Sequence, residues 1–156
     1  MRVPLRRSLL VGMLVLGHAV LAQSPPKRGI DIIMAEGSAL PFLSSEKLAL
    51  IFKRKRNFWD NGERIQPVNL PPAHPLRRAF SQQVFGRSPE ELDDYWRDMY
   101  FHGVLPPFVL ASEEAVIRFV ATTPGAIGYV SACALDHRVT VVLRLDEGPA
   151  CTRQGQ

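Results

Sequence analysis

The sequence predicts a single domain of the α/β class. At Pro124-Gly125 an apolar helical pattern stops and a β-prone run begins at once. Proline cannot continue a helix and glycine accepts the positive φ of a tight exit, so the chain passes from helix to strand within about three residues. Along the rest of the chain, short apolar runs alternate with capped helical patterns, which is typical of α/β folds.

The first elements are a strand, a helix and a second strand. The apolar run at residues 30–35, with Asp31 as its only charge, indicates a short buried strand. The next helix begins at Ser44-Ser45, because a serine side chain accepts from the free amides of a first turn, and it continues to Phe52. The basic residues 53–56 complement the negative end of the helix dipole as a solvated turn, or they form a docking patch. A turn then leads to a short strand at residues 65–68.

Two helices are expected in the middle of the chain. Residues 76–85 form the first, which ends at Gly86. Residues 88–91, Ser-Pro-Glu-Glu, place a capping residue, a first-turn proline and acidic charges in the order expected for the start of the second. Four apolar or aromatic residues then recur at helical spacing, and we interpret the aromatic pair as core or surface residues: Leu92, Tyr95, Trp96 and Met99. Residues 103–108 are expected to form a connection.

The last elements are a helix at residues 112–122 and strands at 126–131 and 139–145. In the helix, the inward-facing residues are expected to be Val116, Ile117, Phe119 and Val120. Gly128 lies in the middle of a strand, which indicates that backbone or a ligand comes close to it, or that packing alone requires a glycine.

The N-terminal segment predicts export to the periplasm of a bacterium. Residues 1–22 combine Arg2, Arg6 and Arg7 with an apolar run and small residues before Gln23, as in a signal peptide, with a retained anchor as the alternative. We expect a signal peptide at 1–22, a mobile leader at 23–29, one domain at 30–146 and a C-terminal tail at 147–156. Stable membrane insertion of the mature chain is not expected.

The charge of the mature chain excludes an electrostatic nucleic-acid interface. Of 19 Lys and Arg residues three leave with the signal peptide, so 19 − 3 = 16 basic residues oppose 15 acidic ones. A nucleic-acid partner would require a basic stripe with many phosphate contacts.

Cys133 and Cys151 are the only cysteines, and both lie in the exported part. A disulfide between them would close a loop of about 18 residues and contribute roughly 3 kcal/mol. Two reduced thiols are the alternative, since spacing alone does not show that the Cα atoms come within reach. No Cys/His pattern for redox chemistry or zinc occurs.

The order of several motifs resembles that of a known family. Its most specific parts are the pairing of Phe52 with Trp59 and the run Thr-Pro-Gly-Ala-Ile-Gly-Tyr-Val from Thr123. Over residues 30–130 the chain resembles the phosphate-binding family of periplasmic substrate-binding proteins of ABC importers. The resemblance implies a three-layer lobe of a type II periplasmic-binding-protein-like fold, with a mixed sheet and flanking helices. Family members have two lobes around an oxyanion, and this chain is long enough for only one.

The segment corresponding to the family's anion-binding loop departs from the family pattern. Where the family carries arginine, serine, glycine and threonine, residues 69–75 read Asn-Leu-Pro-Pro-Ala-His-Pro. Three prolines remove three N–H donors, and no glycine lets the backbone fold around an anion. The remaining candidates for contact with phosphate or another oxyanion are Asn69, His74, Arg77 and Arg78.

These observations predict a non-enzymatic protein that binds a periplasmic protein partner or forms a homodimer. The alternative is the binding of phosphate or a related oxyanion for uptake or sensing. No catalytic residue, metal ligand or cofactor is predicted, because His74, His102 and His137 are scattered and the paired acids occupy helix-capping or solvated positions.

Overall fold

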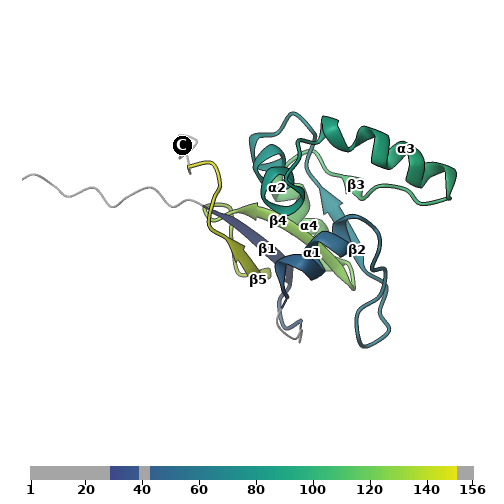
Figure 1. Cartoon of the computed structure of the whole chain (residues 1–156). Coiled ribbons are helices and arrows are strands. Elements are labelled where there is room, and N and C mark those ends of the chain that lie inside the picture. The colour runs from purple at the N-terminus through teal and green to yellow at the C-terminus, as the bar shows by residue number, and fades with distance from the viewer. Residues whose placement is uncertain (1–28, 39–42, 151–156) are drawn as a thin grey trace, which may run out of the picture.

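A five-stranded mixed sheet forms the centre of the protein (Figure 1). The computed structural model of the chain describes residues 29–38 and 43–150. The strands are β1 (Ile30–Ala35), β2 (Gln66–Asn69), β3 (Phe108–Val109), β4 (Ala126–Ser131) and β5 (Val139–Leu145), in the spatial order β3-β2-β4-β1-β5. β2 runs parallel to β3 and β4, whereas β1 is antiparallel to β4 and β5. The α/β class and the mixed sheet predicted from the sequence are therefore confirmed.

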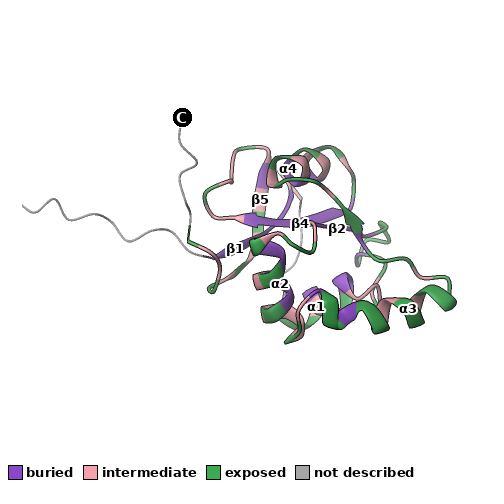
Figure 2. Ribbon diagram, turned by 90° about the horizontal axis from the view of Figure 1, so that it is seen from above, coloured by how far each residue is buried: buried purple, intermediate pink, exposed green. Residues whose placement is uncertain are grey.

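The helices cover both faces of this sheet. They are α1 (Ser45–Phe52), α2 (Pro75–Phe85), the short 3₁₀ helix η1 (Glu90–Leu92), α3 (Asp93–Phe101) and α4 (Glu113–Thr122). Figure 2 shows α4 on one side of the sheet and α1, α2 and α3 on the other. The Ser44 and Ser112 hydroxyls accept from the Lys47 and Ala115 amides, at 3.3 and 3.2 Å, so both predicted serine caps are formed.

Neighbouring residues of β4 face opposite layers, because side chains alternate along a strand. A Cβ on Gly128 would lie 2.6 Å from Cγ1 of Val116 in α4, so the glycine is required by helix packing. On the other face, the Tyr129 ring stacks on Phe80 of α2 at 4.0 Å between ring centroids and lies 5.9 Å from Phe52 of α1. The close approach expected at Gly128 is therefore made by apolar side chains of α4.

The predicted junction at Pro124-Gly125 is held from a distant part of the chain. Gly125 has φ 67°, and a Cβ there would lie 2.2 Å from the Arg64 carbonyl oxygen. The indole Nε1 of Trp59 donates to the Gly125 carbonyl at 3.1 Å. The turn at Trp59 thus fixes the point where α4 ends and β4 begins.

The structure differs from the sequence prediction in two details on the α3 side of the sheet. The segment predicted as a connection at residues 103–108 leads into the edge strand β3. The helical pattern from Leu92 to Met99 is split into η1 and α3, and α3 contains no buried residue, so of the two alternatives for its aromatic pair, core or surface, the structure has the surface. The predicted signal peptide and residues 23–28 of the leader lie outside the described residues and stay predictions.

The contact at Gly128 gives the first testable prediction. Gly128→Ala should lower the free energy of unfolding by about 1–3 kcal/mol, because its Cβ overlaps Val116 in a packed core. Urea denaturation of Gly128→Ala, Val116→Ala and the double variant measures this. The double variant should lose less than the sum of the single losses, since each change touches the same contact. Strict additivity would contradict the contact.

Candidate functional site

His74 and Arg78, two of the four predicted ligand residues, serve the fold. His74 precedes α2 as its N-cap, and its Nδ1 accepts from the Leu76 amide at 3.2 Å. Arg78 lies on the surface, where its two terminal nitrogens donate to the Glu90 carboxylate at 2.6 and 3.3 Å. This ion pair joins α2 to η1. Arg78 is therefore paired within the chain, and the Nδ1 atom of His74 is used by the cap.

Asn69 ends β2 and is buried in a polar group around Tyr129. The Tyr129 hydroxyl donates to Asn69 Oδ1 at 3.3 Å and accepts from the Leu70 amide at 3.2 Å. The Asn69 carbonyl also accepts from the Leu110 amide at 2.8 Å. Burial raises the pKa of the Tyr129 phenol, and the positive charge of Arg77 partly opposes this. Asn69 therefore links β2 to β4 and to the end of β3.

Arg77 is the predicted ligand residue with two side-chain nitrogens that have no hydrogen-bond partner, although its side chain also interacts with Tyr129. Its side chain is buried, with a relative exposure of 7%, and its Nε and Nη1 atoms are unpartnered. One helical turn further along α2, the hydroxyl of Ser81 is fully buried and also unpartnered. An unpaired buried cation is costly, so Arg77 and Ser81 are the buried polar groups of α2 that the described chain leaves without full hydrogen bonding. Sequence reasoning named Arg77 without predicting its burial. Helical periodicity indicates that Arg77 shares a face with Phe80 and Ser81, but not which element covers that face.

A hollow of about 550 Å³ lies where β4 ends and α2 and α4 begin; we call it the strand-end hollow. Its lining includes His74, Pro75, Ser112, Glu113, Glu114 and Ser131. Helix N-termini favour anions, but here carboxylates of the chain occupy the position. The Glu113 carboxylate accepts from the Ser131 amide at 2.6 Å. A further anion would therefore meet like charge in this hollow.

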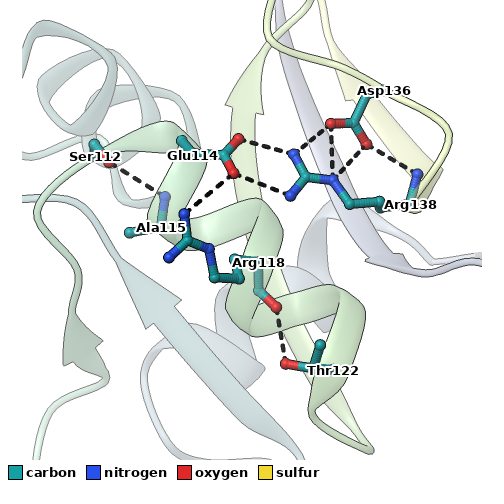
Figure 3. Close-up of polar contacts among 7 residues, drawn as sticks. All are labelled: Ser112, Glu114, Ala115, Arg118, Thr122, Asp136 and Arg138. Atoms are coloured by element: carbon teal, nitrogen blue, oxygen red, sulfur yellow. Dashed lines mark hydrogen bonds and ion pairs between the residues drawn. The ribbon is translucent and has the colours of Figure 1, made fainter.

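The Glu114 carboxylate, which also lines the strand-end hollow, is bound by Arg138 (Figure 3). The terminal nitrogens of Arg138 donate to the two Glu114 oxygens at 3.0 and 2.8 Å, and its guanidinium also binds Asp136. The Arg138 side chain lowers the pKa of Asp136 to about 2, with the Arg138 amide as the next cause, and it also lowers the pKa of Glu114. This network connects the first turn of α4 to the turn before β5.

A second hollow, of about 520 Å³, lies at the opposite edge of the sheet, beside β2 and β3. We call it the arginine hollow, because Arg54 and Arg64 line it together with Phe58, Leu105, Phe108 and Phe119. Neither arginine forms an ion pair among residues 29–38 and 43–150. The hollow therefore combines uncompensated positive charge with aromatic side chains.

Exposed apolar residues gather around the arginine hollow. The described part of the chain exposes eight large apolar residues. Three of them line this hollow, Phe58, Leu105 and Phe108, and three belong to the end of α3 and to β3, next to it in the chain, Tyr100, Phe101 and Val109. We call these six residues the α3–β3 surface. Phe101 and Phe108 are 80% and 77% exposed. Sequence reasoning missed this surface. The available signal was a run of large apolar residues from Tyr100 to Val109 that matches no helical or alternating period.

Cys133, the cysteine within the described residues, is not free. Its predicted partner Cys151 lies outside the described residues, so the disulfide between them stays a prediction. The described residues contain no group of three or more His, Cys, Asp or Glu that could hold a metal ion. Within the same part of the chain, no helix has the length and apolar character needed to cross a membrane.

The fold matches part of several solved phosphate-transport proteins. An ABC-type phosphate transport receptor from Vibrio cholerae matches with a TM-score of 0.62 at 20% identity, over 75% of this chain and 46% of that one. A putative phosphate ABC transporter substrate-binding protein with bound phosphate, from Clostridium perfringens, matches with a TM-score of 0.62 at 21% identity, over 75% and 45%. PstS from Borrelia burgdorferi matches with a TM-score of 0.52 at 16% identity, over 70% and 43%.

This chain therefore spans less than half the length of these proteins and has their fold over that part, as the resemblance predicted. No protein-family model and no curated protein matches the sequence.

The Arg138 network predicts a specific loss of stability in acid. The folded-state pKa of Asp136 lies below its ordinary value of 3.8, so its stabilising contribution is present above pH 3.8 and is lost as the pH falls towards 2. Asp136→Asn should therefore lower the urea midpoint at about pH 7 but have little effect at about pH 2. The difference at neutral pH should shrink in high salt, because the pair is exposed. An equal effect at both pH values would contradict this assignment.

Proposed function

We propose that this chain, which has the fold of one part of phosphate-transport substrate-binding proteins, is an exported, non-enzymatic module that binds another protein molecule. The observation that carries the proposal is the α3–β3 surface. Six large apolar residues on one edge of a small domain are unfavourable in water, and a gathering of this kind favours association. Aromatic residues and arginine are also the types enriched at protein interfaces.

The strand-end hollow supports the same proposal, because the groups in it that could bind an anion are already engaged within the chain. The helix N-termini that could hold an anion are capped by His74 and Ser112, and carboxylates line the space between them. These groups are already used within the chain. At the other edge of the sheet, Arg54 and Arg64 line the arginine hollow, form no ion pair with a described residue and lie next to exposed aromatic side chains, so binding is best supported there.

Oxyanion binding is a second candidate, and it is favoured by one specific observation. The buried Arg77 guanidinium has two unpartnered nitrogens, and the buried Ser81 hydroxyl is unpartnered too. A phosphate or related oxyanion would satisfy these donors through charge-assisted hydrogen bonds. Asn69 and Tyr129 add polar groups nearby. This site lies along α2, within the domain, and is separate from the α3–β3 surface.

The interaction proposal predicts site-specific crosslinking in cells that express the chain. A photoreactive phenylalanine analogue at position 108 should form an adduct of defined mass, identified by mass spectrometry. The same analogue at Val141, on the opposite edge of the sheet, should form none. Adding Phe101→Ser should reduce the adduct at position 108 without changing the melting temperature, because Phe101 is 80% exposed. No adduct at position 108 would contradict the proposal.

The oxyanion candidate predicts a stabilisation by phosphate that depends on Arg77. Phosphate about tenfold above its dissociation constant should stabilise the wild type by roughly 1.4 kcal/mol in thermal denaturation, relative to chloride at equal ionic strength. Arg77→Met should remove this gain, while Arg78→Met, a matched change at an exposed position, should keep it. Without phosphate, Arg77→Met should be neutral or stabilising, since it removes an unpaired buried charge. Equal responses of the wild type and Arg77→Met would reject the candidate.

A further inference from the structure

We propose that the α3–β3 surface binds the same surface of a second copy of this chain, with the C-terminal turn of each α3 seated in the arginine hollow of the other copy. This inference rests on the proposed function, because it names the partner that the surface takes. The two elements that it joins are the arginine hollow and the exposed end of α3.

The arginine hollow lacks a negative charge of its own. Arg54 and Arg64 both line it, and no carboxylate of the described residues pairs with either one. The Arg54 guanidinium donates to the Ile65 carbonyl at 3.4 Å, which leaves its charge unopposed. Burial lowers the pKa of Arg54, and the positive charge of Arg64 lowers it further. A carboxylate with apolar neighbours is the group that this hollow would accept most favourably.

The end of α3 presents this combination of groups. Its last turn carries Asp98, Tyr100 and Phe101, and the Asp98 side chain is 73% exposed. Among the described residues, the nearest basic side chain to this carboxylate is His102, whose Nδ1 lies 4.0 Å from it, and no Lys or Arg pairs with it. No residue of α3 is buried, and Figure 2 shows the helix extending from the body of the domain. An exposed aromatic helix of this kind gains most from covering its apolar side chains.

The arrangement of these two elements favours a second copy over a different partner. A two-fold interface joins one patch to itself, so both complementary elements must lie on the same surface of a single chain. Here residues 103–108 follow α3 directly and line the arginine hollow, which places the acidic helix end and its complement side by side. A different protein would need its own acidic, aromatic segment and its own basic hollow to form the same two contacts. The chain thus carries both halves of a reciprocal contact.

Charge reversal tests this contact in the full exported chain, purified after processing by the cell. Sedimentation velocity should show that the wild type forms a dimer. Arg64→Glu and Asp98→Lys should each weaken dimerisation by about tenfold or more, because each change places like charges opposite one another in both halves of the interface. Arg87→Glu and Glu147→Lys, at exposed positions elsewhere, serve as matched controls and should dimerise as the wild type does.

Mixing the two variants gives the decisive result. An Arg64→Glu chain and an Asp98→Lys chain should form a heterodimer, since one half of the interface is native and the other has both charges reversed. Failure of the mixture to associate, with both variants folded by circular dichroism, would overturn the proposal, as would a wild type that stays monomeric. If adducts of position 108 with a different protein persisted in that case, only the second-copy inference would fail. If those adducts were also absent, the proposed function would be contradicted as well.

Discussion

The packing of β4 between two helical layers is the constraint on which the rest of this structure depends. Two consecutive residues satisfy it in opposite ways. Gly128 has no side chain, so Val116 and Val120 of α4 can reach the sheet. Tyr129 turns a large ring to the other face, where it stacks on Phe80 and meets Phe52. Because β1 and β2 flank β4, any displacement of this strand would move both layers of helices and the neighbouring strands together.

The hydroxyl of Tyr129 extends this constraint to the segment before α2. It bridges the Leu70 amide and the Asn69 side chain, so the end of β2 is fixed by a buried hydrogen bond from the central strand. A loop rich in proline has few amides with which to organise itself. In this segment, hydrogen bonds come instead from Tyr129 of β4 and from the His74 cap. Arg77, one turn into α2, is consequently drawn into the interior beside the phenol.

The sequence predicted the parts of this fold that depend on local chemistry. The serine caps of α1 and α4, the Pro124-Gly125 junction and the glycine at Gly86 are decided by residues close in the chain, and the structure has them. The burial of Arg77 and the exposure of α3 were not predictable in this way. Both depend on which distant element covers a helix face: Tyr129 lies against α2, whereas no element buries a residue of α3. The candidate site was therefore predicted as a list of residues whose grouping only the tertiary structure decides.

The distribution of satisfied and unsatisfied charge explains why binding is best assigned to the edge of the sheet. A helix N-terminus attracts an anion only while its amides are free. In this chain the serine and histidine caps use those amides, Glu113 binds the Ser131 amide, and Glu114 is neutralised by Arg138, so the strand-end hollow offers little to a soluble anion. At the other edge, Arg54 and Arg64 lie uncompensated among exposed aromatic residues. Removing such a surface from water gains apolar burial and charge pairing in the same step, and a protein surface with a carboxylate beside aromatic side chains can provide both.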